Sequence, residues 1–344
     1  KQKAKSAETV YLATDPDREG EAIAFHLSQE VPNASVERVQ FTEITRYGIE
    51  EGMNHPRGLD YDLVEAQKAR RIIDRLVGYK ISELLRRSIQ KTLSNLKKSL
   101  SAGRVQSSTV KILVDRERQR MKFKDVTYFD LKSEMLTKKD EPFSAALFSL
   151  SDMKLATGKD FDSTTGELKN KKVMMLSETQ AQALIEELSS GPWTIIDREE
   201  KPQTSYPPPP FITSTLQQAA GTKLRFSAKR TMITAQKLYE NGFITYMRTD
   251  SVQLSSEAIQ SARNMIKSSF GEKYLPEKPN YYKSKVKNAQ EAHEAIRPAG
   301  SAIKSAEEVE RSLGKDAVNL YKLIRMRTLA CQMNPAKILR TIIL

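Results

Sequence analysis

Residues 13–22 read ATDPDREGEA, and this stretch decides how the beginning of the chain folds. It follows an apolar run that starts at Val10 and precedes a helical pattern over residues 20–30, so carboxylates crowd a strand-to-helix junction. Acids at a helix start also suit the helix dipole, but that explains only one or two of them. Mg²⁺ is bound in proteins by one or two carboxylates with water and phosphate oxygens. We therefore predict a Mg²⁺ site at Asp15, Asp17 and Glu19.

The pattern around this junction alternates strand and helix, and later segments change character. A proline run at residues 207–210 can form neither a helix nor an inner strand, so it predicts a linker between domains. The fold class predicted is a multi-domain protein with α/β, mainly helical and β-rich domains. The strands are expected at 10–14, 36–41 and 338–344, a β-rich segment with one helix near 178–189 at 127–200, and helices at 20–30, from about 43, at 63–85, from about 105, over much of 213–270 and at 307–331, with a basic loop at 86–100.

The composition favours a nucleic acid as partner. The chain has 344 residues, with 56 lysines and arginines against 43 acids, for a formal charge of +13. Its single cysteine, Cys331, excludes an internal disulfide and is expected in a buried helix. No apolar run is long enough to span a membrane, and the basic start lacks an apolar signal core. We expect a cytoplasmic protein with no membrane partner.

A second motif, GFITYMRTDS at residues 242–251, offers a nucleophile. The pKa of a phenol, near 10, makes Tyr246 a weak nucleophile unless nearby groups stabilise the developing charge. Arg248, two residues on, can supply a cation at a phosphate. The chain has no Gly-rich loop of the kind that binds ATP phosphates. These residues are compatible with attack of Tyr246 on a phosphate without ATP, and the alternative is that Tyr246 is an ordinary packed or surface aromatic.

A third motif, EAHEAIRP at residues 291–298, places His293 and Arg297 four positions apart. If this stretch is helical, both side chains share a face and can donate hydrogen bonds to phosphate oxygens. The second histidine of a zinc-protease motif is missing, so that alternative fails.

Two basic segments predict contacts with a DNA strand. Arg71, Arg75 and Tyr79 recur every four positions on a helix, where they can hold a phosphate and a stacked base. The apolar residues between them, Ile72, Ile73, Leu76 and Val77, are expected to face a core. In SAGRVQS at 101–107, small residues admit a phosphate, and Arg104, Gln106 and Ser107 can bind it. The alternative for the helix is a solvated basic stripe.

These motifs resemble those of a known family. The acidic stretch resembles the Toprim motif of type IA and type II topoisomerases, primases and some nucleases, and its extension to residue 26 is most similar to the type IA form. The Tyr246 motif resembles the type IA active-site tyrosine motif, and matches in the expected order span about residues 10 to 335. They are closer to the bacterial topoisomerase I branch than to topoisomerase III.

The resemblance implies a partial type IA topoisomerase core with a truncated Toprim domain. It implies that Tyr246 cleaves one strand through a 5′-phosphotyrosine, assisted by Arg248, His293 and Mg²⁺, and that a monomer relaxes negative supercoils at single-stranded regions of DNA. The domains it implies are a truncated Toprim domain at 1–62, part of a strand-binding domain at 63–124, the first part of a β-rich arch at 125–205, the tyrosine domain at 206–334 and a return strand at 335–344.

The chain is expected to be a fragment that cleaves DNA poorly. Both ends fall close to strand patterns, and the glutamate and lysine of the family's first Toprim strand have no counterpart here. The alternatives are a single-stranded DNA-binding fragment without a working nucleophile and a Toprim primase or nuclease.

Overall fold

The structure is a computed structural model that describes residues 2–90, 99–189, 193–283 and 294–344. The chain divides into two compact units. The first comprises Lys1–Arg71 with Glu199–Ile342, and the second comprises Ile72–Arg198 with Ile343–Leu344. The expected motifs around Asp15 and Tyr246 therefore belong to the same unit.

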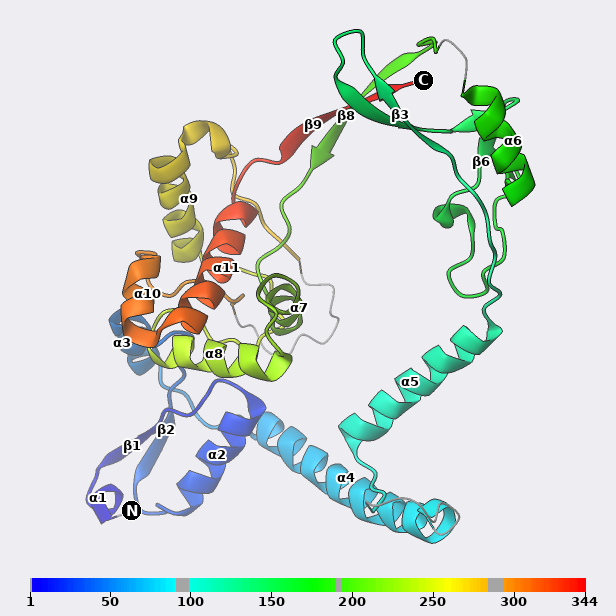
Figure 1. Cartoon of the computed structure of the whole chain (residues 1–344). Helices are drawn as coiled ribbons and strands as arrows, with labels where there is room; N and C mark the ends of the chain where they lie inside the picture. The colour runs from blue at the N-terminus through cyan, green and yellow to red at the C-terminus, as the bar shows by residue number, and fades with distance from the viewer. Residues whose placement is uncertain (1, 91–98, 190–192, 284–293) are drawn as a thin grey trace. The chain divides into compact units, whose positions relative to one another are not determined.

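The first unit begins with a strand, a helix and a parallel strand. Strand β1 (Thr9–Leu12) pairs in parallel with β2 (Ser35–Arg38), with Val10 opposite Val36. Parallel neighbours need a crossover connection, and helix α2 (Arg18–Gln29) provides it beside the two strands (Figure 1). The predicted alternation is confirmed, with α1 (Gln2–Lys5) before it and α3 (Arg46–Asn54) after it.

The rest of the first unit is mainly helical and contains the larger core. Helices α7, α8, α10 and α11 pack around Leu216, Leu238, Ile244 and Tyr321, which are at most 1% exposed. Cys331 ends α11 and is buried, as predicted. The elements are α7 (Thr213–Leu224), α8 (Ala228–Glu240), α9 (Ser256–Phe270), the short 3₁₀ turn η3 (Glu272–Tyr274), α10 (Ala306–Leu313) and α11 (Lys315–Cys331).

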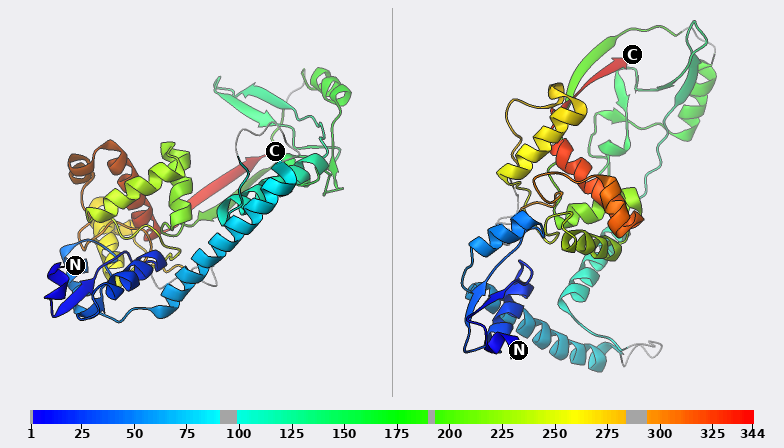
Figure 2. Two further views of the ribbon diagram at one scale, coloured as in Figure 1. Left: turned by 90° about the horizontal axis from the view of Figure 1, so that it is seen from below. Right: turned by 90° about the vertical axis from the view of Figure 1, so that its left-hand side faces the viewer.

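Two strands accompany this helical part. Strand β8 (Arg198–Ser205) pairs with β9 (Ala336–Ile343), and the two lie side by side in both views of Figure 2. The proline run that follows β8 forms neither helix nor strand, as its composition predicts. It lies inside the first unit, however, and not at a boundary between the two units, which the chain crosses at residues 198–199.

The second unit is β-rich, as predicted, and α6 is the helix expected within its sheet segment. Helix α4 (Tyr61–Leu85) begins in the first unit and continues into the second. A small core of Leu155, Leu176 and Leu184 joins the strands to α6. The remaining elements are α5 (Arg104–Lys122), β3 (Lys132–Leu136) antiparallel to β4 (Pro142–Ala146), the sheet of β5 (Ser149–Leu150), β6 (Met153–Leu155) and β7 (Val173–Met174), the 3₁₀ turn η2 (Gly158–Asp160) and α6 (Glu178–Leu188).

Two expectations about this unit were wrong. The loop predicted from Arg86 begins instead as a π-helical turn, η1 (Arg86–Gln90), where Ser88 Oγ donates a hydrogen bond to the Leu84 carbonyl at 2.8 Å. Residues 91–98 of that loop lie outside the described residues. The apolar face of α4 is also not in a core, since Ile72, Ile73 and Leu76 are each more than half exposed and Val77 is 37% exposed.

Among the described residues, no helix combines the length and the apolar character that crossing a membrane requires.

Gly242 fixes the path of the chain before the Tyr246 motif. Its φ is +67°, in the left-handed region that L residues with a side chain avoid. A Cβ atom here would lie 2.2 Å from the carbonyl oxygen of Ile44. Residues 242–246 can therefore run beside residues 42–44 only with glycine at this position.

We expect Gly242→Ala to lower the free energy of unfolding by more than 2 kcal/mol, because backbone strain of roughly 1–2 kcal/mol adds to the clash with Ile44. Gly271→Ala is the matched control, since Gly271 also has a positive φ, +101°, but no atom lies within 4 Å of its Cβ position. Chemical denaturation measures both variants. Equal losses would show that the close approach to Ile44 has no energetic importance.

Candidate active site

The acidic stretch forms a tight loop between β1 and α2. Asp17 caps α2, accepting a hydrogen bond from the Gly20 N–H at 2.8 Å, and Thr14 Oγ1 donates to the Gly20 carbonyl at 2.6 Å. A Cβ on Gly20 would lie 2.0 Å from the Asp15 carbonyl oxygen, so only glycine allows the loop to close this tightly. Asp15 and Asp17 are thereby held close to each other.

A network of buried ion pairs holds this loop in place. Arg38 and Glu21 are both fully buried and form an ion pair at 2.9 Å. Arg38 also donates to the carbonyl oxygens of Leu12 at 2.9 Å and Asp15 at 2.8 Å, which fixes the end of β1 and the loop. Glu21 accepts further hydrogen bonds from Arg57 at 2.9 Å and from the Asp60 N–H at 2.8 Å.

The Glu21 carboxylate stays charged although it is fully buried. Burial, the largest influence, disfavours the carboxylate, but the hydrogen bonds from Asp60, Arg57 and Arg38 outweigh it and lower the pKa of Glu21. Glu21 therefore remains ionised and continues to hold Arg38 in place.

The Tyr246 segment is non-helical and is held from both sides. The Tyr246 N–H donates to the Thr42 carbonyl at 2.8 Å, and Thr245 Oγ1 donates to the Ala295 carbonyl at 2.8 Å. Thr213, the first residue of α7, donates from Oγ1 to the Met247 carbonyl at 2.8 Å. Thr213 thus ties α7 to the tyrosine segment.

The phenol of Tyr246 meets the acidic loop. Its hydroxyl donates to Asp17 Oδ2 at 2.7 Å, and its ring packs edge-on against Tyr239 with 5.1 Å between ring centres. Arg248 approaches the same Asp17 oxygen at 3.2 Å, while its side chain remains 56% exposed. The structure thus brings together three of the residues expected in the site, with Arg248 accessible to a phosphate.

The electrostatics of this cluster disfavour a free phenolate. Burial raises the pKa of Tyr246 most strongly, and the hydrogen bond to Asp17 and the charges of Asp17 and Asp15 raise it further. Arg248 acts in the opposite direction. Burial also raises the pKa of Asp15, followed by repulsion from Asp17. The site has an excess of negative charge that a cation would relieve.

The three carboxylates expected to share Mg²⁺ do not converge. Glu19 is ion-paired with Arg70 at 2.8 Å, because the first turn of α2 directs it toward α4. Within the described ranges, no group of three or more histidine, cysteine, aspartate or glutamate side chains is arranged to hold a metal ion. Asp15 and Asp17 fit a hard cation by donor chemistry and by their mutual repulsion. The metal role of Glu19 stays a prediction that requires it to leave Arg70.

Arg297, expected to bind phosphate, is engaged by carboxylates. It is 7% exposed, and its guanidinium donates to Glu294 Oε1 and Oε2 at 2.7 Å each and to Glu43 Oε2 at 2.9 Å. The Gly300 N–H also donates to Glu43, at 3.0 Å. Arg297 thus joins the end of the Toprim-like segment to the tyrosine segment, and its contact with DNA stays a prediction.

The helix considered for the third motif is absent from its described part. Residues 294–300 instead make isolated β-bridges, Ile296 with Phe211 and Pro298 with Ile244. The backbone of this stretch pairs with the tyrosine segment, and it therefore does not form the helix that the spacing of four between His293 and Arg297 suggested. His293 lies outside the described residues.

The predicted strand-binding residues are exposed. Arg71 lies on α4 at the edge of the first unit. In the second unit the Arg75 guanidinium lies 5.7 Å from the centre of the Tyr79 ring, and both residues line a cavity of about 400 Å³ with Asp74.

The other basic segment starts helix α5 in the same unit. Arg104 forms a two-point ion pair with Asp74, at 2.9 and 3.1 Å. Gln106 donates to Ser101 Oγ at 3.2 Å, and Ser107 Oγ accepts the Gly103 N–H at 3.2 Å. These contacts order the start of α5 while the side chains remain exposed.

Sequence reasoning missed the residues that support the site. Glu21, Arg38 and Glu43 are buried charges, whereas isolated charged residues are usually on the surface. One signal was available for Arg38, which lies between Val36 and Val39 in the strand predicted over residues 36–41.

We expect Arg297→Gln to lower the free energy of unfolding by about 3–5 kcal/mol, because it leaves the buried Glu43 and the partly buried Glu294 without their cation. Arg248→Gln is the control, since its exposed pair with Asp17 contributes about 0–1 kcal/mol. Denaturant unfolding compares the two. A small loss for Arg297→Gln would mean that the buried carboxylates do not depend on it.

The pKa of Tyr246 should respond oppositely to its two charged neighbours. Asp17→Asn removes a negative charge and a hydrogen-bond acceptor that disfavour the phenolate, so we expect the pKa to fall toward its ordinary value. Arg248→Gln removes a favourable cation, so we expect it to rise. Ultraviolet titration of each protein against its Tyr246→Phe counterpart isolates this phenol. An unchanged pKa in Asp17→Asn would contradict the assigned electrostatics.

Comparisons with known proteins agree with this arrangement. The profile of a family described as DNA topoisomerase matches residues 58–344, and the Toprim domain profile matches residues 1–44. The protein named DNA topoisomerase 1 from Synechocystis sp. is 49% identical over 336 residues, and that from Mycobacterium tuberculosis is 47% identical over 343. Each alignment covers 97% of this chain and 36% of the relative, so the chain spans about a third of their length.

A solved structure is similar as well. Full-length topoisomerase I from Thermotoga maritima superimposes with a TM-score of 0.74 at 37% sequence identity, covering 99% of this chain and 51% of the other. The match extends over both units of the chain.

Proposed function

Because the chain belongs to the DNA topoisomerase family, we propose that it carries the strand-cleaving centre of a type IA enzyme, with Tyr246 as nucleophile. One observation carries the proposal. The Tyr246 hydroxyl lies 2.7 Å from Asp17 Oδ2 in the Toprim-like loop, beside the accessible cation of Arg248. In the proposed site, Tyr246 would be the nucleophile, Asp17 the acceptor for its proton and Arg248 the cation that binds the phosphate.

The reaction is a transesterification. Tyr246 Oη attacks a phosphodiester phosphorus, and the bond from phosphorus to the 3′ oxygen breaks. The departing 3′ oxygen takes up a proton from water, so the products are a 5′-phosphotyrosine and a strand with a free 3′-hydroxyl. Attack by that hydroxyl reverses the step without ATP. Asp17 is the group placed to receive the Tyr246 proton, and Arg248 stabilises charge on the phosphate oxygens.

Asp15 and Asp17 would hold Mg²⁺, with Glu19 joining them if it leaves Arg70. The ion, when bound, would supply positive charge that positions the 3′-hydroxyl and a phosphate for rejoining. His293, by resemblance, would contact the reacting phosphate.

The strand itself would be held by exposed basic and aromatic side chains. Arg75 with Tyr79 offers a cation and a stacking ring, as single-strand binding requires. The other exposed members of the proposed DNA-binding set are Arg71, Arg104, Gln106 and Ser107. Arg297 is buried in its ion pairs with Glu43 and Glu294, and it would contact DNA only after leaving them. The intact protein would act as a cytoplasmic monomer that relaxes negative supercoils at single-stranded regions.

A second candidate is a single-stranded DNA-binding fragment without a working nucleophile. Burial and the hydrogen bond to Asp17 raise the pKa of Tyr246 and keep the proton on the phenol, which favours this alternative.

Covalent capture of DNA separates the two. We expect the intact protein, incubated with Mg²⁺ and single-stranded DNA, to form an adduct that retains a 3′ label and releases a 5′-labelled fragment. Tyr246→Phe should abolish it. Tyr239→Phe is the matched control, because Tyr239 is an adjacent buried tyrosine whose hydroxyl donates only to the Phe41 carbonyl, at 2.8 Å. DNA binding without an adduct would support the second candidate, and an adduct that survives in Tyr246→Phe would remove this residue as nucleophile.

A further inference from the structure

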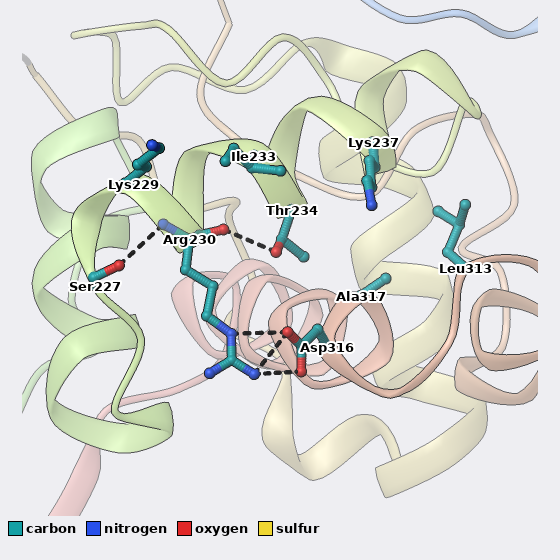
Figure 3. A pocket seen from close by; sticks show the side chains of 9 residues that line it. All are labelled: Ser227, Lys229, Arg230, Ile233, Thr234, Lys237, Leu313, Asp316 and Ala317. Carbon is teal, nitrogen blue, oxygen red and sulfur yellow. Dashed lines mark hydrogen bonds and ion pairs between the residues drawn. The ribbon is translucent and has the colours of Figure 1, made fainter.

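A basic groove lies on the outer side of α8, separate from the Tyr246 cluster. It is a cavity of about 320 Å³ between α8 and the start of α11. Figure 3 shows Lys229 and Lys237 leaving α8 at its two ends, with Arg230 reaching across to Asp316. None of these residues takes part in the proposed reaction. The lining is Ser227, Lys229, Arg230, Ile233, Thr234, Lys237, Leu313, Asp316 and Ala317.

The one acid of the groove is already neutralised. Arg230 donates from Nε and Nη2 to the two Asp316 oxygens at 2.8 Å each, and its guanidinium lies 4.3 Å from the centre of the Phe226 ring. This two-point pair holds α8 against α11 and gives the groove a fixed wall. Asp316 is therefore not available to Lys229 or Lys237.

The two lysines of the groove remain without an acid. Within the ranges that the structure describes, no carboxylate lies at ion-pairing distance from Lys229 or Lys237. Both are exposed and lie eight positions apart on α8, about 12 Å along the axis at the rise of an α-helix. The surface is complementary to a polyanion that extends beyond one phosphate group.

The groove lacks what a single strand requires. Single-strand binding combines cations with aromatic rings on which bases stack, and no aromatic side chain lines this cavity. The nearby Phe226 ring is 7% exposed and carries Arg230. The lysines of the groove could therefore contact phosphate groups but could not stack on bases. A duplex presents phosphates on its outside and keeps its bases stacked inside, so it fits this surface.

We propose that the α8 groove binds the backbone of duplex DNA through Lys229 and Lys237, independently of base sequence and apart from the strand at Tyr246. The proposal rests on the proposed function in one respect, that DNA is the substrate. It adds a second DNA contact, which would hold the duplex next to the cleaved region.

The salt dependence of binding tests it. The probe is a duplex of roughly 30 base pairs, about three helical turns, and the measured quantity is the slope of log affinity against log salt concentration. Each phosphate contact contributes about 0.9 to the magnitude of this slope. We therefore expect the double variant Lys229→Gln/Lys237→Gln to have a slope about 2 smaller in magnitude than the unsubstituted protein. The charge-preserving pair Lys229→Arg/Lys237→Arg should keep the original slope. Lys273→Gln/Lys278→Gln, two exposed lysines after α9, is the matched control and should also keep it.

Several outcomes overturn the proposal. They are an unchanged duplex slope in the Gln pair, a change seen only with a single strand, and loss of binding to an acidic peptide while duplex binding is intact. Thermal unfolding shows whether each variant is folded.

Adduct formation with a short single strand separates this proposal from the proposed function. It should be unaffected by the Lys229 and Lys237 substitutions. If no adduct forms even in the unsubstituted protein, the cleavage proposal fails, and the duplex slope still decides the role of the groove.

Discussion

The hydrogen bond from Tyr246 to Asp17 is the constraint on which the site depends. It joins side chains 229 positions apart at 2.7 Å, and with the contact of Arg248 to the same Asp17 oxygen at 3.2 Å it brings the tyrosine segment to the acidic loop. Its chemistry acts in two directions. It orients the phenol proton toward Asp17, the proposed acceptor, and together with burial, the larger influence, it raises the pKa of the phenol. A cation at Asp15 and Asp17 would offset the negative charge that disfavours the phenolate.

Buried charges keep both partners of this bond in place. Arg38 and Glu21 fix the acidic loop, while Arg297 with Glu43 fixes the tyrosine segment. Removing one member of a buried ion pair leaves the charge of the other without a partner and strongly destabilises the fold, so the residues of each network stay paired. Exposed charges have the opposite property. Arg248 near Asp17 and the lysines of α8 are free to exchange partners, which is what binding to a phosphate needs.

Much of the fold was predictable because its signals are local. Apolar periodicity predicted the alternation of β1, α2 and β2 and the helices around Tyr246, and the acid-rich junction and the tyrosine motif were visible as short runs. The contacts that give these residues roles are not local. Nothing in the spacing indicates that Glu19 pairs with Arg70, that Arg297 is held by Glu43, or that backbone pairing replaces the helix considered around Arg297. The apolar face of α4 is a further example. The spacing of its apolar residues predicts that they share one face of the helix, but it does not predict whether another element packs against that face.

A double-mutant cycle on the free energy of unfolding tests the central claim most directly. It compares Tyr246→Phe, Asp17→Asn and the combined variant, so that effects of Asp17 on the cap of α2 cancel. A charged hydrogen bond between the two side chains predicts a coupling energy of about 1.5–3 kcal/mol. Effects that add to within about 0.5 kcal/mol would show that the tyrosine and the acidic loop do not interact, and would contradict the site described.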